Sequence, residues 1–433
     1  MPRTPRRAFA PHRDLSFTVF LLAVVLSLLR ARDLPSVELR VGGADLSVGP
    51  VDLALLATGL LAVRRVWARR TVPSRHLVLA AAAFAGLIAA SAIPNGADAL
   101  TSAGRLVELF ALTLGVVAFV DERERLVTLL GVVVGFCVAA VAWGAVEFVA
   151  GGGGRQGSFM GEHDLAALGT LAVVIGLAAV YARPGRPVPV ALAGLVAGGL
   201  AIALGASLAS LLGLYLAAGV LLALALARRA LRKGALVVTF VVVVAVTGAT
   251  LVLRTGELGF IQEWFGPEPE RPGQYAASWS QRLIFAYVGG RVFLDRPVLG
   301  TGWHGELPAD DYARYLPDAR ARFPDQPEQY FRDLEGTFIP QQTYDQILLE
   351  LGVVGGLLFL LIAFLAVRHA LGVGLRAPPL EYALVPAGWL AGLAGALAGA
   401  ALFGGSPVAS LFWLTLGVVA AIPHVVGEGR ARL

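Results

Sequence analysis

Charged residues and cysteines are scarce in this chain. Of its 433 residues, 15% are Asp, Glu, Lys or Arg and 57% are apolar, and the single cysteine is Cys137. One cysteine excludes an intramolecular disulfide and any metal site built from several thiolates. So few charges over this length exclude an ordinary soluble globular protein, whose water-exposed surface needs more of them. The composition therefore predicts an integral membrane protein.

Motifs of the common soluble enzymes are also absent. No glycine-rich phosphate loop precedes a Lys-Ser/Thr pair, and no two histidines have the spacing of a helical zinc site. The GGGG run at 151–154 is more typical of a flexible joint than of a phosphate site. We find no internal sequence repeat, and no convincing pair of matched halves of the kind many transporters have. We expect neither a cofactor nor a metal ion.

Apolar runs that fit a bilayer crossing dominate what is present. A transmembrane helix needs about 20 mainly apolar residues. Twelve such runs lie at 15–30, 48–63, 77–93, 104–120, 126–150, 164–181, 187–205, 207–227, 235–253, 344–367, 380–403 and 406–424. The predicted fold class is therefore all-α: a polytopic integral membrane protein of about 12 transmembrane helices.

Arginine clusters orient these predicted spans, because cytoplasmic flanks prefer Arg and Lys. If Arg3, Arg6, Arg7 and Arg13 are cytoplasmic and each run crosses once, the later clusters fall on the same side. These are the clusters at 64–75, 123–125, 183–186, 228–233, 368–376 and 430–432. We expect both termini in the cytoplasm of a bacterium and the first span to be an uncleaved anchor in the cytoplasmic (inner) membrane.

One long segment, 254–343, leaves the membrane on the extracytoplasmic side. It separates an N-terminal bundle at 1–253, with about nine spans, from about three C-terminal spans at 344–433. Loops of this length are usually functional or disordered, and this one is too aromatic for simple disorder. Its nine arginines and thirteen carboxylates make it net acidic. General attraction of polyanions, nucleic acid included, is not expected; single arginines aimed at one anion are.

An amphipathic helix is predicted within this loop, from near Ser280 to before Pro297. Its apolar face holds Leu283, Ile284, Tyr287, Val288 and Leu294, with Arg282 and Arg291 at the edges. Since both ends of the loop are tied to the membrane domain, we expect this helix to lie along the bilayer surface among membrane lipids.

Three motifs give the chain a family resemblance. The stretch SWSQRLIFAYVGGRVFLDRPVLGTG contains Arg282 and a Pro-Val-Leu-Gly-Thr-Gly turn. In PQQTYDQILLELGVVGG, nine residues separate Gln341-Gln342 from Gly352, and Gly355 follows. RQGSF supplies Arg155 before a span. Together they resemble the O-antigen ligase and O-antigen polymerase superfamily of bacterial envelope enzymes, which have ten to fourteen spans and a large extracytoplasmic loop.

The resemblance implies a chemistry and its partners. Such enzymes are glycosyltransferases of cell-envelope polysaccharide biosynthesis. They transfer glycan from an undecaprenyl diphosphate donor to a hydroxyl of a glycan or lipid acceptor, without nucleotide sugar or required metal. Arginine suits the departing diphosphate because its planar fork binds phosphate oxygens and keeps its charge. We therefore predict Arg282 as a catalytic residue, and Arg155, Arg291, Gln341 and Gln342 as substrate-binding residues.

Two departures from the family pattern leave alternatives open. Gln341 stands where the family motif has histidine, and an amide does not accept a proton at neutral pH. Leu208 stands where an arginine is expected. We predict His304, on the glycine turn, as the substitute catalytic base. The alternatives are a catalytically inactive relative with a binding or scaffolding role, and a lipid-glycan transporter or exporter. Ligation and polymerisation both fit.

Each predicted site residue also has a plain structural role available. Arg282 and Arg291 would bind lipid phosphates as ordinary interfacial arginines, and Arg155 would anchor the end of its span. His304 would be a turn residue, and Gln341 and Gln342 would be hydrogen-bonding residues at the start of a helix.

Overall fold

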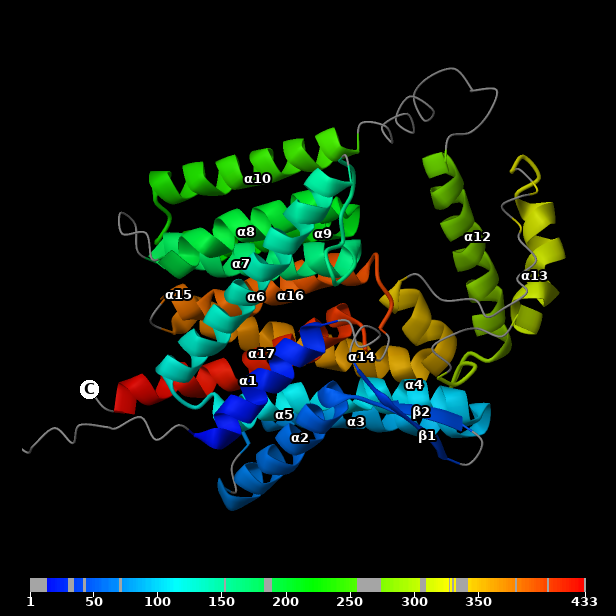
Figure 1. The fold of residues 1–433 in the computed structure, drawn as a ribbon, viewed down its shortest axis with the longest axis horizontal. Helices are drawn as coiled ribbons and strands as arrows, with labels where there is room; N and C mark the ends of the chain where they lie inside the picture. The colour runs from blue at the N-terminus through cyan, green and yellow to red at the C-terminus, as the bar shows by residue number, and fades with distance from the viewer. Residues whose placement is uncertain are drawn as a thin grey trace, which may run out of the picture.

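The computed structural model describes residues 14–29, 35–41, 44–69, 72–151, 153–182, 189–254, 274–303, 309–326, 328, 331, 342–377, 380–402 and 405–431. Helices make up most of this part of the chain, as Figure 1 shows. The first half contains α1 (Leu15–Leu28), α2 (Pro50–Arg69), α3 (Arg75–Ala92), the 3-10 turn η2 (Ile93–Asn95), α4 (Ala97–Glu108), α5 (Phe110–Phe119), α6 (Arg123–Ala150), α7 (Glu162–Ala182) and α8 (Pro189–Gly205). The second half contains α9 (Leu208–Ala227), α10 (Lys233–Leu253), α12 (Gln274–Asp295), α13 (Ala309–Arg322), α14 (Thr343–Arg376), α15 (Leu380–Ala383), α16 (Val385–Leu397) and α17 (Pro407–Ala431).

The all-α class and the membrane character are confirmed. Within the described residues, seven helical segments are long and apolar enough to cross a membrane, and four further apolar helices are shorter. The seven are α3 with η2, α4 with α5, α6, α7, α9, α10 and α14; the shorter ones are α1, α8, α16 and Pro407–Ile422 of α17. The chain is thus a multi-pass membrane protein, and most of these segments match a predicted run to within a few residues. The exceptions are α14 and α4, which are longer than predicted, and α16, which is shorter; the predicted run at 48–63 corresponds to α2, which is in neither group.

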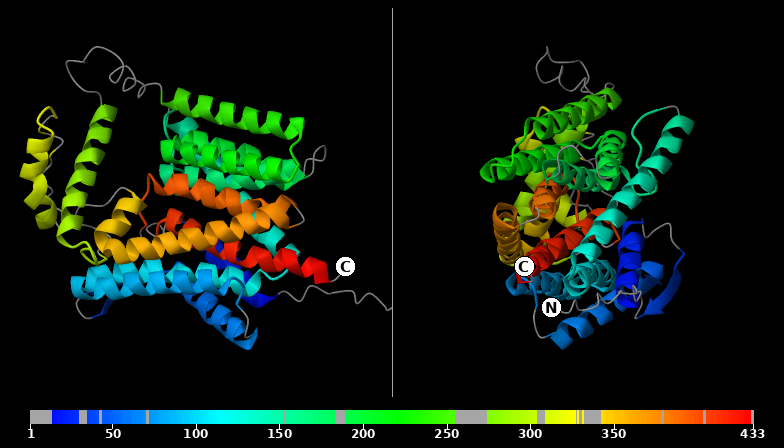
Figure 2. Two further views of the ribbon diagram at one scale, coloured as in Figure 1. Left: turned by 180° about the vertical axis from the view of Figure 1, so that it is seen from behind. Right: turned by 90° about the vertical axis from the view of Figure 1, so that its left-hand side faces the viewer.

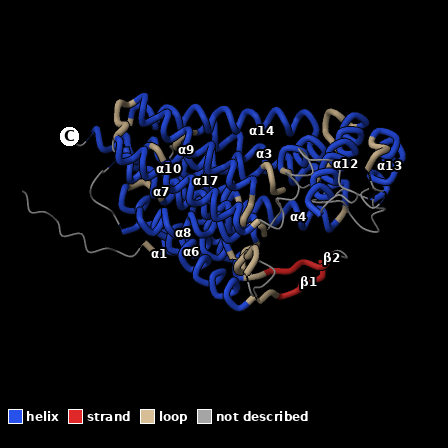
Figure 3. Tube along the Cα trace, turned by 90° about the horizontal axis from the view of Figure 1, so that it is seen from above, coloured by secondary structure: helices blue, strands red, loops and turns tan. Residues whose placement is uncertain are grey.

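The sequence analysis missed an antiparallel hairpin formed by β1 (Val37–Val41) and β2 (Ala44–Val48). It lies at the flank of the bundle, as Figure 3 shows. Arg105 of α4 donates to the carbonyl of Ser47 in the second strand at 3.4 Å, which ties the hairpin to the bundle.

Glycines allow two helix pairs to pack with their backbones almost touching. Between α7 and α8, a Cβ on Gly198 would lie 2.5 Å from the carbonyl oxygen of Gly169. Between α9 and α16, a Cβ on Gly213 would lie 2.4 Å from the carbonyl oxygen of Gly392. Helices inside lipid gain little from apolar burial against each other, so close packing of small residues is what holds them together. The contact between α9 and α16 joins a predicted N-terminal span to a predicted C-terminal span in one bundle.

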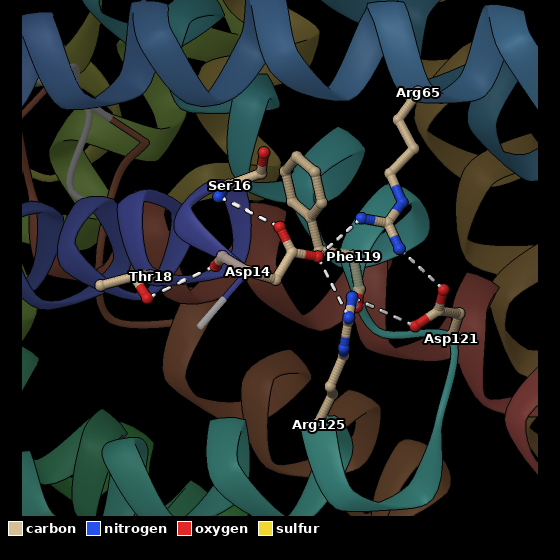
Figure 4. A network of polar contacts seen from close by, with 7 residues as sticks. All are labelled: Asp14, Ser16, Thr18, Arg65, Phe119, Asp121 and Arg125. Carbon is tan, nitrogen blue, oxygen red and sulfur yellow. Dashed lines mark hydrogen bonds and ion pairs between the residues drawn. The ribbon is translucent and has the colours of Figure 1, made fainter. Parts of the chain in front are cut away.

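The helices alternate in direction, so the bundle has two distinct ends. At one end, the start of α1, the end of α2 and the connection from α5 to α6 meet around Asp14 (Figure 4). We call this the Asp14 end. At the other end, η2 meets the segment that follows α12, through hydrogen bonds to the backbone of Thr301 and Trp303. We call this the Trp303 end. Figures 1 and 2 show α12 and α13 beyond it, running across the direction of the bundle helices.

The Asp14 end is held by a four-residue ion network. The Asp14 carboxylate forms ion pairs with Arg65 at 2.8 Å and with Arg125 at 3.0 Å. Asp121 also pairs with both arginines, with Arg65 at 3.0 Å and with Arg125 at 3.3 Å. Asp14 also caps α1 by accepting from the backbone N–H of Ser16. Burial alone would raise the pKa of Asp14, but the hydrogen bond from Arg65 and the nearby arginine charges lower it below its ordinary value.

The lowered pKa predicts a pH-dependent stability for Asp14. A carboxyl whose pKa is lower when folded stabilises the fold at pH values above its unfolded pKa, and the contribution is lost as pH falls through the folded pKa. We expect Asp14→Asn to lower the unfolding free energy by about 1–2 kcal/mol at pH 7. The difference from wild type should begin to shrink near the ordinary pKa of 3.8 and disappear once the pH has fallen through the lower pKa of the folded state. Thermal unfolding in detergent, followed by tryptophan fluorescence across pH, measures this.

Glu124→Gln is the matched control, because Glu124 is exposed in the first turn of α6 and forms no side-chain contact in the described part of the chain. Equal effects of the two substitutions at pH 7 would contradict the stabilising role of Asp14.

Candidate functional site

A sharp break divides α14 at Gly352, which has a φ of 62° and a ψ of −159°. A short helix, residues 343–351, precedes the break, and residues 353–376 follow it in a different direction (Figure 2). The sequence predicted one uninterrupted span at 344–367, and this is wrong in one respect: the polar residues at its start lie before the break. A break leaves backbone N–H and C=O groups without helical partners, which must be satisfied by other groups.

The glycine turn after α12 supplies those partners. Four backbone hydrogen bonds join the two segments, in donor-to-acceptor order: Thr301 to Leu349 (3.0 Å), Gly302 to Glu350 (2.9 Å), Val353 to Pro297 (2.8 Å) and Val354 to Val298 (3.1 Å). Two bonds fall on each side of the break. Two of the three motifs that carry the family resemblance are therefore bound directly to each other. We call this contact the turn–break junction.

Glycine is required at this junction because the backbones touch. Gly300, Gly302 and Gly352 all have positive φ angles, which side chains disfavour. A Cβ on Gly352 would lie 2.5 Å from the carbonyl oxygen of Val298, and one on Gly300 would lie 2.5 Å from that of Leu349. Both the positive φ angles and the lack of space for a Cβ exclude larger residues at these positions.

The junction is fixed to the bundle by Asn95 at the end of η2. Its side-chain nitrogen lies within hydrogen-bond distance of the carbonyls of Thr301 (3.3 Å), Trp303 (3.4 Å) and Ser91 (3.4 Å). The hydroxyl of Ser91 accepts from the backbone N–H of Trp303 at 3.3 Å. The indole of Trp303 is fully buried. The chain is therefore held in place up to the residue that directly precedes His304.

Polar side chains of the short helix hydrogen-bond to the backbone N–H and C=O groups of a second non-helical segment, residues 398–402, which follows α16. The Gln346 amide accepts from the N–H of Leu402 at 2.8 Å and donates to its carbonyl at 3.1 Å. The hydroxyl of Thr343 donates to the carbonyl of Ala400 at 2.6 Å. Irregular backbone at membrane depth is tolerated where it is buried in protein and hydrogen-bonded. This explains why polar residues precede the apolar part of α14.

Glu350 is the buried carboxyl of the same short helix. It is fully buried; one oxygen lies 3.4 Å from the amide nitrogen of Gln346, and the other has no hydrogen-bond partner among the described residues. Glu350 was not among the site residues predicted from the sequence. Its spacing of four from Gln346 is the signal that would have found this contact.

Arg155 binds at the connection between α8 and α9. Its guanidinium pairs with Glu162 at 2.6 Å and lies 3.4 Å from the carbonyl of Gly205. Arg254, at the end of α10, donates to the next carbonyl, that of Ala206, at 2.6 Å. Two arginines thus bind adjacent carbonyls at the end of α8, where a helix presents its partial negative charge.

Arg291 belongs to the contact between α12 and α13. Its guanidinium pairs with Asp318 of α13 at 3.0 Å and lies over the ring of Tyr315, 5.9 Å from the centroid. Asp318 also accepts from the Tyr287 hydroxyl, and this hydrogen bond raises the pKa of the phenol. No described contact joins Arg291 to Arg155.

The matched family model is that of O-antigen ligase, and it covers residues 193–360. This range contains the arginine helix, the glycine turn and the break in α14, and so the whole turn–break junction. The match supports the O-antigen ligase-like superfamily for this part of the chain. The resemblance predicted from the sequence is confirmed. No curated protein matches the chain.

Three of the predicted site residues of this O-antigen ligase-like protein lie partly or wholly outside the described residues. His304 and Gln341 are outside them; Arg282 lies in α12, and its side chain is outside the description. Gln342 directly precedes α14, and its carbonyl accepts from the N–H of Gln346 at 3.0 Å. Among the residues described, no group of three or more His, Cys, Asp or Glu is placed to hold a metal ion.

The junction predicts that Gly352→Ala disrupts this end of the ligase-like domain. We expect a loss of at least about 2 kcal/mol of unfolding free energy, from the positive φ and the clash with Val298. Thermal unfolding in detergent measures the loss. Gly289→Ala is the control, since a Cβ there meets nothing within 4 Å in α12. A Gly352→Ala protein as stable as the Gly289→Ala protein would contradict the proposed rigidity of the junction.

Proposed function

We propose that the protein transfers or polymerises a glycan carried on undecaprenyl diphosphate, at the extracytoplasmic face of the bacterial cytoplasmic membrane. The observation that supports this best is the turn–break junction, because it binds the segments that carry the predicted site residues to each other at one end of the bundle. In the sequence, Arg282 precedes the glycine turn and His304 directly follows it, and Gln342 directly precedes the short helix on which the turn docks. The family match over 193–360 supports glycan transfer of the O-antigen ligase type.

The proposed membrane arrangement has twelve crossings, with both termini cytoplasmic. The alternating helices support this number: α1, α2, α3, α4 with α5, α6, α7, α8, α9, α10, α14, α16 and α17 would each cross once. The Asp14 end is then cytoplasmic, because the arginine clusters flank it. The Trp303 end is extracytoplasmic, and residues 254–343 form the large loop beyond it.

In the proposed reaction, an acceptor hydroxyl loses its proton and its oxygen bonds to the anomeric carbon of the donor sugar. The bond from that carbon to the diphosphate oxygen breaks, and undecaprenyl diphosphate leaves with the electron pair. Arg282 would stabilise the charge that develops on the diphosphate. His304 would take the proton, a role that Gln341 lacks the basicity to fill.

The remaining predicted residues have supporting roles in this proposal. Gln341 and Gln342 would hydrogen-bond the acceptor sugar. Arg155 would hold the diphosphate only if it exchanged its ion pair with Glu162 for the ligand, and Arg291 would have to leave Asp318. Breaking an ion pair reduces the net gain from a new one, so Arg282 is the first arginine to test.

Arg282→Ala is expected to weaken binding of undecaprenyl-diphosphate glycan by about tenfold to a hundredfold, the value of a charge-assisted hydrogen bond. The measurement is a titration of the purified protein in nanodiscs with the lipid-linked glycan. Arg314→Ala is the matched control, because Arg314 is an exposed arginine of α13 that pairs with Asp295. If the Arg282→Ala and wild-type proteins bind equally well, Arg282 does not hold the diphosphate.

His304→Ala is expected to reduce turnover by about a hundredfold or more while leaving donor binding intact, as removal of a general base does. The assay follows release of undecaprenyl diphosphate in the presence of acceptor. Full turnover in this variant would remove His304 as the base. Absence of turnover in the wild type, with donor binding intact, would favour the inactive relative; movement of intact lipid-linked glycan across a vesicle membrane would favour the transporter.

A further inference from the structure

Helix α12 has two apolar faces, and α13 covers one of them. Ile284, Val288 and Val292 of α12 are buried against Tyr312 and Leu316 of α13. The sequence analysis placed Leu283 and Leu294 on the same face as Ile284 and Val288, and this is wrong. The structure separates them, because the helical turn of 100° per residue carries positions 283 and 294 to the other side.

The second face is apolar and exposed. Leu283 is 59% exposed and Leu294 is 64% exposed. Ala286 and Gly290 are exposed between them, so positions 283, 286, 290 and 294 form one stripe along the helix. Two exposed leucines on one helical stripe of a helix that already has a partner on its other face indicate a second apolar contact.

The stripe continues through the glycine turn onto the transmembrane surface. Val298 and Leu299 follow Leu294 and are 62% and 60% exposed. The carbonyl of Val298 accepts from the N–H of Val354, the first residue of an outward-facing row on α14. That row has helical spacing and consists of Val354, Leu357, Leu361 and Phe364, all exposed in the bundle. The exposed apolar surface of the bundle and that of α12 therefore meet at the turn–break junction.

The orientation of α12 fits a position at the membrane surface. Figures 1 and 2 show that α12 crosses the direction of the bundle helices and that α13 lies on its far side from the bundle. The stripe is opposite the face that α13 covers, so it is turned toward the level at which the bundle helices end. Arg296, exposed between Leu294 and Val298, is placed to reach lipid phosphates from this level.

We propose that α12 lies in the extracytoplasmic leaflet of the bilayer, in contact with lipid through Leu283 and Leu294 of its stripe and through Val298 and Leu299 of the glycine turn. The occupant of this face is the boundary between lipid headgroups and acyl chains, and α13 covers the aqueous side of the helix. Continuity with the lipid-facing row of α14 favours bulk lipid over a protein partner, since the same surrounding medium must meet both surfaces.

Site-directed spin labelling in nanodiscs tests this position of α12 in the membrane. Single Leu283→Cys and Leu294→Cys proteins carry a nitroxide, and Cys137 need not be replaced because it is fully buried. Leu357→Cys on α14 is the lipid reference, and Arg314→Cys on α13 is the water reference, being 66% exposed in its side chain. We expect the labels at 283 and 294 to collide with dissolved oxygen more than with a water-soluble nickel chelate, as at 357 and opposite to 314.

Two outcomes overturn the proposal. Nickel accessibility at 283 and 294 equal to that at 314 would place the face in water. Low accessibility to both reagents would place it under protein, such as a second copy of this chain. Photolabelling of the unmodified protein by a diazirine phosphatidylcholine is the second measurement: the tryptic peptide that follows Arg282 should be labelled and peptides of α13 should not. Labelling of α13 alone would also contradict the proposed contact between α12 and lipid. Neither readout depends on glycan transfer.

Discussion

Unsatisfied backbone polar groups cost several kcal/mol in hydrocarbon, and this constraint explains the polar residues of the protein. Among the described residues, three interruptions or ends of bundle helices are met by specific partners. The break at Gly352 is met by the glycine turn, and the segment after α16 is met by Gln346 and Thr343. The carbonyls at the end of α8 are met by Arg155 and Arg254. The partners of the break at Gly352 lie at the Trp303 end, which is also where two of the family motifs meet.

The limits of the membrane helices could be predicted from the sequence, because a bilayer imposes a length and a composition that each span must meet locally. The separation of α8 from α9 was predicted by the two apolar runs at 187–205 and 207–227, and the arginine clusters fall on one side when each of these runs crosses once. The hairpin around Ala44 was missed because short strands have weak local signals, and its tie to Arg105 is a tertiary contact. The break at Gly352 was missed for the same reason: its hydrogen-bond partners lie about 50 residues earlier in the chain.

The candidate site could be predicted only in part. The motifs with Arg282, the glycine turn and Gln342 do meet at one end of the bundle, but sequence order does not show which side chains are already engaged. Arg155 and Arg291 hold carboxylates from other helices. Glu350 was not predicted as a site residue, and its contact is with Gln346, one helical turn away. Apolar periodicity likewise identified α12 as amphipathic and could not divide its leucines between a protein partner and the surrounding medium.

The anchoring of the loop has a consequence for how such a protein can diversify. The N–H of Gly302 donates to the carbonyl of Glu350, and Gln342 directly precedes the short helix that contains Glu350. The chain between residues 302 and 342 therefore leaves and rejoins the bundle at one place. The entropy of closing a loop rises only slowly with its length. Insertions and deletions in this stretch that spare α13 can therefore accumulate with little effect on the stability of the bundle. Relatives with the same membrane domain can carry loops of different length there while the framework is retained.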